Sequence, residues 1–248
     1  MLDGSVQATA SADSAARVAE LTERYGRLEG AALLNALVRD EFPGRIAVVS
    51  SFGTESAVLL ALAAEADPSF PVFFIDTGKL FGETLRYRDT LARTLGLTDI
   101  RTIGPTPQEV AASDPDGLLF TKSLDSCCHL RKTIPLDHAL QGVDAWVTGR
   151  KRFQSSTRAA LTLFEAEEGT GRVKVNPLAH WDRARIEDEF SRRGLPRHPL
   201  EADGYLSIGC FTCTERVAPG ADPRSGRWAG SAKTECGIHT FSKTGTAQ

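Results

Sequence analysis

The chain has 248 residues, of which 41% are hydrophobic and 25% are charged, enough to bury one sizeable core and carry an appendage. A formal net charge of −3 gives no general attraction to nucleic acid or an anionic membrane, and no apolar run or basic, apolar leader indicates membrane insertion or export. We therefore expect a cytoplasmic protein, and in that reducing compartment its five cysteines indicate metal binding or catalysis rather than disulfides.

Hydrophobic periodicity along the chain predicts helices and strands in alternation. The segments that predict helices are 11–26, 29–41, 54 to about 65, 82–95, the vicinity of 127 to about 141, and 182–194. The short apolar runs that predict strands are 45–51, 71–76, 98–104, 145–149 and 172–177. This alternation favours an α/β fold, with a parallel twisted sheet and helices on both of its faces.

The chain divides by composition into three parts. Residues 1–44 are expected to form an N-terminal helical segment, and residues 45–195 an α/β nucleotide-binding domain. Over 196–248 the regular pattern fails, and Pro, Gly, Cys and Arg dominate. We expect this last part to be an irregular C-terminal appendage rather than a second core.

The loop SSFGTES, at 50–56, follows the first predicted strand. Parallel sheets bind ligands at the carboxyl ends of their strands, and backbone N–H groups at a glycine turn before a helix form an anion site. Ser50, Ser51 and Thr54 can add hydroxyl donors, although an ordinary turn capped by Thr54 is the alternative. The loop lacks the Walker and Rossmann glycine spacings, so neither a Walker ATPase nor a dinucleotide dehydrogenase is indicated.

Two further loops lie at the same predicted edge of the sheet. Asp76 and Thr77 are candidates to bond a ribose or a base, with Gly78 permitting close approach, although a plain strand-to-helix loop is the alternative. TGRKRFQSSTR, at 148–158, concentrates four basic residues that include Arg158. A charge run is usually a solvated surface, but this position in an acidic protein favours a small polyanionic ligand.

Four of the five cysteines form an adjacent pair, Cys127 and Cys128, and a C-x-x-C, Cys210 and Cys213. Four thiolates in these two groups indicate an iron–sulfur cluster, with zinc, redox thiols or buried thiols as alternatives. The adjacent pair is awkward for tetrahedral zinc, whereas neighbouring cysteines can bind two corners of a cubane.

The fifth cysteine, Cys236, lies in KTECGIHT near the end of the sequence. A lysine and His239 flank it, and positive charge favours the nucleophilic thiolate, whereas Glu235 acts against it. Arg224 and Arg227, in DPRSGRW, are spaced to grip phosphate or sulfate with their planar side chains. When each residue is considered alone, the alternative for Cys236 is an exposed thiol without a function. The alternative for Arg224 and Arg227 is that they are ordinary surface arginines.

Seven motifs in this order, SSFGTES, IDTGKLFGET, CCHLRK, TGRKRFQSSTR, CFTC, PRSGRW and KTECGIH, resemble the iron–sulfur branch of the phosphoadenylyl-sulfate and adenylyl-sulfate reductase family, over about residues 45–241. The resemblance implies a fold of the adenine nucleotide hydrolase (PP-loop) type. It implies one 4Fe–4S cluster per chain, held by Cys127, Cys128, Cys210 and Cys213. The implied modified phosphate loop contains Ser50, Ser51, Gly53 and Glu55, and the implied adenosine-contacting turn contains Asp76, Thr77 and Gly78. The basic residues that match those around the phosphosulfate are Lys132, Arg158, Arg224, Arg227 and His239.

The family resemblance also implies a reaction. Cys236 attacks the sulfur of adenylyl sulfate, AMP leaves, and thioredoxin releases sulfite from the resulting S-sulfocysteine, in assimilatory sulfate reduction for cysteine biosynthesis. A mobile tail is expected to close over the substrate and then open for thioredoxin. Because relatives are commonly homo-oligomers, we expect a homo-oligomer, without nucleic-acid or membrane partners.

Three other functions are compatible with parts of the sequence: reduction of the 3′-phosphorylated substrate, ATP-dependent sulfur transfer by a PP-loop pyrophosphatase, and a non-enzymatic metal or redox module. Phe52 stands where related ATP pyrophosphatases carry a second glycine, and its bulk is expected to crowd a pyrophosphate, which argues against ATP hydrolysis. Phe153 and Ser156 also depart from the residues common in the resembled family.

Overall fold

The computed structural model describes residues 3–231, 233 and 235–239. Within them the chain forms a six-stranded sheet in the order β3-β2-β1-β4-β6-β5. Its strands are β1 (Ile46–Ser50), β2 (Val72–Ile75), β3 (Ile100–Ile103), β4 (Ala145–Val147), β5 (Phe164–Ala166) and β6 (Val173–Val175). All neighbours pair in parallel except β5 and β6, which are antiparallel. The five predicted strands are confirmed, and β5 is an addition.

The helices of the described chain include one at each predicted position. They are α1 (Asp3–Tyr25), α2 (Gly30–Ala36), α3 (Ser56–Ala66), α4 (Gly82–Leu95), α5 (Pro107–Ser113), α6 (Leu119–Lys122), α7 (Leu124–Cys128), α8 (Ile134–Ala139) and α9 (Arg183–Arg193). The first helix thus begins at Asp3, earlier than predicted. None of these helices is both long and apolar enough to span a membrane.

Shorter helical turns complete the described chain. Two π-helical segments are η1 (Leu37–Glu41), which continues α2, and η2 (His129–Thr133), which joins α7 to α8. The 3₁₀ turns are η3 (Arg152–Gln154), η4 (Ser156–Arg158), η5 (Pro199–Glu201), η6 (Phe211–Cys213) and η7 (Gly237–His239). The single helix predicted from the vicinity of the cysteine pair to about residue 141 is therefore α7, η2 and α8 in continuous succession.

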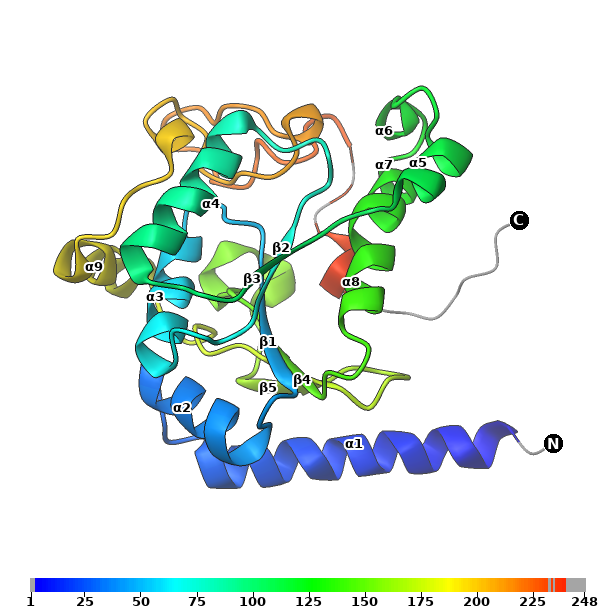
Figure 1. The fold of residues 1–248 in the computed structure, drawn as a ribbon, viewed down its shortest axis with the longest axis vertical. Coiled ribbons are helices and arrows are strands. Elements are labelled where there is room, and N and C mark those ends of the chain that lie inside the picture. The colour runs from blue at the N-terminus through cyan, green and yellow to red at the C-terminus, as the bar shows by residue number, and fades with distance from the viewer. Residues whose placement is uncertain (1–2, 232, 234, 240–248) are drawn as a thin grey trace.

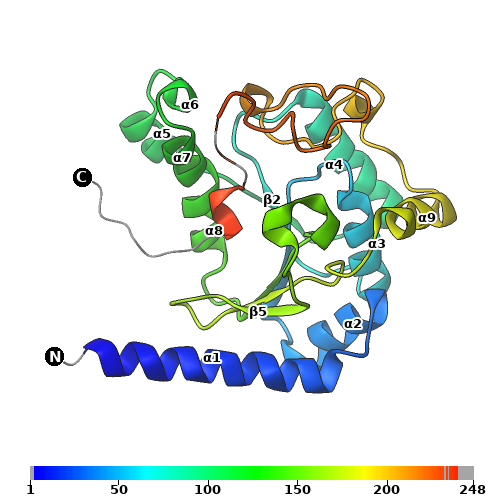
Figure 2. The ribbon, with the colours of Figure 1, turned by 180° about the vertical axis from the view of Figure 1, so that it is seen from behind.

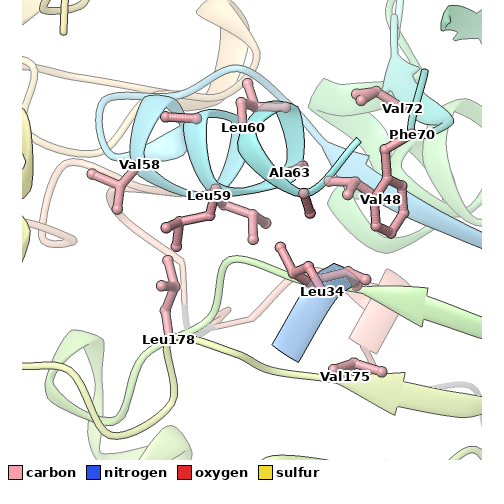
Figure 3. Close-up of a cluster of buried hydrophobic side chains, with 14 of the residues drawn as sticks. Leu34, Val48, Val58, Leu59, Leu60, Ala63, Phe70, Val72, Val175 and Leu178 are labelled. Atoms are coloured by element: carbon pink, nitrogen blue, oxygen red, sulfur yellow. The ribbon is translucent and has the colours of Figure 1, made fainter. Parts of the chain in front are cut away.

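Helices cover both faces of the sheet, as predicted, and Figures 1 and 2 show α3 and α4 on one side and α7 and α8 on the other. Strand β1 is buried along its whole length because alternate side chains enter two separate cores. Val48 belongs to the larger core beneath α3, which Figure 3 shows with Leu59, Phe70 and Val72. Val49 belongs to the smaller core beneath α8.

The C-terminal appendage crosses the carboxyl ends of the strands (Figures 1 and 2). Leu80 and Cys210 form an antiparallel bridge, and the Phe211 N–H donates to the Lys79 carbonyl at 2.9 Å. The Thr54 hydroxyl donates to the Leu206 carbonyl at 3.1 Å. The irregular segment is therefore attached by hydrogen bonds to the loops after β1 and β2, where an α/β sheet binds ligands.

Candidate functional site

One pocket lies at the carboxyl ends of the strands, between the loops after β1, β2 and β4 and the C-terminal segment. The structure brings together here most of the residues singled out in the sequence. Those that line it are Ser50, Ser51, Gly53, Glu55, Thr77, Lys132, Arg158, Arg224, Arg227 and Cys236. Asp76 and Gly78 do not line it, and the side chain of His239 falls outside the part of the chain that the structure describes.

The turn after β1 contains a residue in a left-handed conformation. The Phe52 N–H donates to the Ser50 hydroxyl at 3.1 Å, and Phe52 has a φ of 51°. Its ring is fully buried and meets the edge of Phe74, with the ring centroids 5.2 Å apart. The expectation that this ring crowds the phosphate site is wrong, because the side chain packs into the core and not into the pocket. Phe52 nevertheless adopts the left-handed backbone conformation that glycine favours.

The rest of this loop lies close to the appendage and to the basic loop after β4. A Cβ on Gly53 would lie 3.3 Å from the Ile208 carbonyl oxygen, so the turn leaves little room there for a side chain. The Glu55 carboxylate accepts from Lys151 Nζ at 2.8 Å and from Gln154 Nε2 at 2.7 Å. Burial raises the pKa of Glu55, but these two partners lower it more, so the carboxylate is ionised.

The loop after β2 connects the pocket to the cysteine segments. Asp76 Oδ1 accepts from the Gly78 N–H at 2.9 Å, which closes a turn whose glycine has a φ of 67°. The buried Thr77 hydroxyl lies 3.2 Å from Cys210 Sγ. Thr77 is therefore the member of this predicted trio that reaches the pocket, whereas Asp76 and Gly78 shape the turn.

Arg131 was not among the predicted site residues, yet it holds this loop against the cysteine helix. Its Nη1 donates to the Thr77 carbonyl at 2.8 Å, and its Nη2 donates to Asp114 Oδ2 at 2.6 Å. The two side chains of this ion pair are 8% and 0% exposed. The sequence signal was weak because Asp114 lies 17 positions away, in a loop with no motif.

The basic loop after β4 is largely neutralised within the protein. Arg150 pairs with Glu165, and Lys151 pairs with Glu55. Burial lowers the pKa of both Arg150 and Lys151, and the facing carboxylates only partly offset this effect. A bound anion would therefore meet less free positive charge here than the sequence indicates.

Four of the five cysteines, all except Cys236, lie on two segments that meet beside the pocket. Cys127, Cys128 and Cys210 are buried, and Cys213 is half-buried. Burial raises the pKa of Cys127, and Cys210 and Cys213 are close enough to raise it further. Among the described residues, no group of three or more Cys, His, Asp and Glu side chains is arranged to hold a metal ion.

Cys236 occupies the pocket wall together with two cations. A hydrogen bond from the Cys128 thiol lowers the pKa of Cys236 well below its ordinary value, and burial opposes this while Lys132 and Arg227 assist it. The pKa of Lys132 is lowered by burial but raised more by the surrounding cysteines, so its amine stays protonated. If Cys128 binds a metal and loses its proton, the two cations remain to stabilise the thiolate.

Gly209 was also missed in the sequence, and it makes room for Arg227. A Cβ on Gly209 would lie 2.3 Å from Nη2 and 2.6 Å from Cζ of Arg227, so only glycine fits beside this guanidinium. Arg227 stacks 4.6 Å from the ring centroid of Trp228. Its Nε is buried and has no hydrogen-bond partner within the described chain. A buried, unpaired donor at a pocket wall is suited to an anionic ligand.

Fold and site together define the class: an α/β protein with a cationic pocket, and a cysteine in its wall, at the carboxyl ends of a mainly parallel sheet. Residues 45–216 match the phosphoadenosine phosphosulfate reductase domain family. The chain is 52% identical over 225 residues to the adenosine 5′-phosphosulfate reductase of Mesorhizobium japonicum, covering 91% of this chain and 88% of that one. It is 40% identical over 226 residues to the protein of that name from Mycolicibacterium smegmatis, covering 89% and 94%. The chain belongs to the phosphoadenosine phosphosulfate reductase family.

Solved structures agree with the fold. The phosphoadenylyl-sulfate (PAPS) reductase from Candida auris, in a phosphate complex, has a TM-score of 0.68 and 27% identity, and the match covers 80% of this chain and 96% of that one. The FMN adenylyltransferase from Candida glabrata has a TM-score of 0.53 and 16% identity, covering 86% and 77%. The latter likeness concerns the fold alone.

Proposed function

We propose that this chain reduces adenylyl sulfate to sulfite and AMP, with Cys236 as nucleophile and thioredoxin as reductant. The observation that carries the proposal is the position of Cys236 in a pocket wall that it shares with Lys132 and Arg227. The 52% identity to a protein named adenosine 5′-phosphosulfate reductase supports this substrate. In the cell, the reaction would belong to sulfate assimilation and cysteine biosynthesis.

In the first step, the Cys236 thiolate attacks the sulfate sulfur. A sulfur–sulfur bond forms while the bond from sulfur to the bridging phosphate oxygen breaks, and AMP leaves with that electron pair. The leaving phosphate gains negative charge, which Lys132 and Arg227 are placed to stabilise from the same wall. The unpaired, buried Nε of Arg227 gains a hydrogen-bond acceptor when an anionic oxygen binds there.

In the second step, a thiolate of reduced thioredoxin attacks Cys236 Sγ. Sulfite leaves with the electron pair of the sulfur–sulfur bond, and the second thioredoxin thiol resolves the mixed disulfide. The transferred sulfur is thereby reduced by two electrons, and the dithiol is oxidised by two. An external dithiol is proposed because the four remaining cysteines are assigned to a cluster.

We further propose that Cys127, Cys128, Cys210 and Cys213 hold one 4Fe–4S cluster. The donor set fits, since Cys210 and Cys213 lie close enough to Cys127 to raise its pKa, and Thr77, which contacts Cys210, also accepts from Arg131. Four cysteine thiolates are the donor set that a 4Fe–4S cluster takes, so these four residues would hold it. When bound, the cluster would cross-link the two segments and add negative charge near Lys132. Cys210→Ser should lower bound iron and sulfide, whereas Cys236→Ser should not.

The remaining expectations complete the proposal. In this proposal residues 1–44 form a helical N-terminal segment, residues 45–195 form the reductase domain, and residues 196–248 form a tail that closes over the substrate and opens. Residues 1–2, 232, 234 and 240–248 lie outside the part that the structure describes. The protein acts in the cytoplasm, as a homo-oligomer. Reduction of the 3′-phosphorylated substrate by the same steps is the second candidate, supported by the likeness to a PAPS reductase at 27% identity.

The deciding experiment is anaerobic intact-protein mass spectrometry after mixing with adenylyl sulfate in the absence of thioredoxin. We expect a gain of one sulfonate group that reduced thioredoxin removes, and Cys236→Ser should show no gain. Parallel samples receive the 3′-phosphorylated substrate or ATP. An adduct with the 3′-phosphorylated substrate alone would make the second candidate correct. AMP formed from ATP, without any adduct, would refute the reductase function.

A further inference from the structure

The residue that precedes the nucleophile is bound on several sides. Arg158 donates from Nε and Nη2 to the two carboxylate oxygens of Glu235, at 2.8 Å each. The hydroxyls of Ser155 and Thr157 donate to Glu235 Oε1 at 3.3 and 3.2 Å, and Arg224 Nη2 lies 3.5 Å from Oε2. The Arg158 and Glu235 side chains are only 10% and 18% exposed. We call this arrangement the Glu235 clasp.

The Arg158 side chain of the Glu235 clasp is itself held in place by a hydrogen bond to Gln154. Gln154 Oε1 accepts a hydrogen bond from Arg158, and Gln154 Nε2 donates to Glu55 Oε2 at 2.7 Å. The same carboxylate oxygen accepts from Lys151 Nζ at 2.8 Å. A chain of polar contacts therefore runs from the loop after β1 to the tail, and it orients the Arg158 guanidinium toward Glu235.

The other side of Cys236 is anchored by apolar packing. Ile238 packs against the smaller core, whose members include Val49, Phe73 and Leu136. Between these two anchors, Cys236 is one residue from Glu235 and two from Ile238. Its sulfur therefore has little freedom to move along the pocket wall.

The charge state of Glu235 agrees with an ionic clasp. Burial raises the pKa of this carboxylate, but the hydrogen bonds from Arg158 and the charges of Arg158 and Arg224 lower it more, so it is ionised. The role assigned to Arg158 in the sequence was a substrate contact. In the structure its guanidinium forms a bidentate ion pair with the Glu235 carboxylate.

We propose that Glu235 is a positioning residue for the nucleophile: its carboxylate, bound by Arg158, holds Cys236 in the pocket wall for attack. Arg158 then serves to bind the tail. Glu235 acts through the position of Cys236 and touches no reacting atom. The role of the clasp in the reaction rests on the proposed function, whereas its role in holding the tail does not.

The test compares cluster-loaded wild-type protein with Glu235→Gln, Arg158→Met and the double variant. Glu215→Gln is the matched control, the same change at an exposed glutamate of the C-terminal segment. The first readout is the rate of iodoacetamide modification at Cys236, measured by peptide mass spectrometry without substrate at about pH 9, where a released thiol is mostly ionised. The second readout is kcat and KM for adenylyl sulfate.

We expect modification of Cys236 to be about 10- to 100-fold faster in both single variants, the range that the loss of charged hydrogen bonds gives. The double variant should be no faster than the single ones, since both changes break the same contact. We expect kcat to fall by a similar factor while KM changes by less than about 3-fold. The control should match wild type in every measurement.

Two results would overturn the positioning role. One is modification of Glu235→Gln at the wild-type rate, and the other is a rise in KM with kcat unchanged, which would make the cluster of Glu235 and Arg158 a substrate site. Glu235→Asp keeps the charge on a shorter side chain and should give intermediate modification rates, so it decides the matter if Glu235→Gln does not fold. If wild type forms no sulfonate adduct, the proposed function fails, yet the modification rates still test the clasp.

Discussion

Substituting Gly209 by alanine tests how the C-terminal segment places Arg227 in the pocket. The new Cβ would lie 2.3 Å from Nη2 and 2.6 Å from Cζ of Arg227, far inside van der Waals contact. The guanidinium must therefore leave its position on the Trp228 ring, where its Cζ lies 4.6 Å from the ring centroid. The buried, unpaired Nε of Arg227 moves with it.

The size of the effect follows from what Arg227 is proposed to do. A hydrogen bond to a charged group is worth about 1.5–3 kcal/mol, so kcat/KM for adenylyl sulfate should fall about 10- to 100-fold. Arg227→Ala should cause a similar loss. Combining it with Gly209→Ala should add little, because both changes remove the same contact.

The matched control for Gly209→Ala is Gly82→Ala. A Cβ on Gly82 would lie 3.3 Å from Arg86 Nη1, but the Arg86 side chain is 72% exposed and can turn away into solvent. Steady-state kinetics of this control should lie within about 2-fold of wild type. Wild-type kcat/KM in Gly209→Ala, or full additivity with Arg227→Ala, would refute the reasoning.

Three other predictions concern stability. Burial lowers the pKa of His198 from 6.5 to about 4, so the folded state keeps the ring neutral where the unfolded state protonates it. The free energy of unfolding should therefore be highest above pH 6.5 and fall by about 3 kcal/mol as the pH decreases from 6.5 to about 4. Urea unfolding of His198→Asn should lack this loss, and an equal pH dependence in both proteins would contradict the assignment. Asp114→Asn, which breaks the buried pair with Arg131, should lower the free energy of unfolding by about 3–5 kcal/mol. Asp99→Asn, which breaks the more exposed pair with Arg101, should lower it by less than about 1 kcal/mol. Equal losses in the two variants would refute the role of burial. Phe52→Ala should cost about 3–5 kcal/mol in urea unfolding without conferring ATP hydrolysis, and a gain of that activity would mean that the ring does guard the pocket.

The sheet was readable from the sequence because strands β1, β2 and β4 are short, mainly apolar runs between helical segments. Val48 and Val49 illustrate this, since both faces of β1 are buried and four of its five residues are apolar. Strand β5 was not readable because its three residues carry one buried side chain, Phe164, and pair only with the edge of β6.

The residue types of the site were also visible in the sequence. The cysteine pair, the C-x-x-C and Cys236 are rare patterns, and chemistry restricts what a thiol in such a pattern can do. The loop SSFGTES indicated a strand end, and the structure places its Ser50, Gly53 and Glu55 in the pocket. These features are local, so the order of the residues carries them.

Only the tertiary structure decided which acidic side chain pairs with which basic one. Glu55 and Lys151 are 96 positions apart, and Glu235 and Arg158 are 77 apart, so no local pattern relates either pair. Likewise, the missing Cβ of Gly209 matters only because Arg227 folds back onto it. The sequence determined which chemical groups are available, because covalent order fixes them. The fold determined which charges neutralise one another and which face the pocket, because electrostatic and packing energies depend on distance in space and not on separation along the chain.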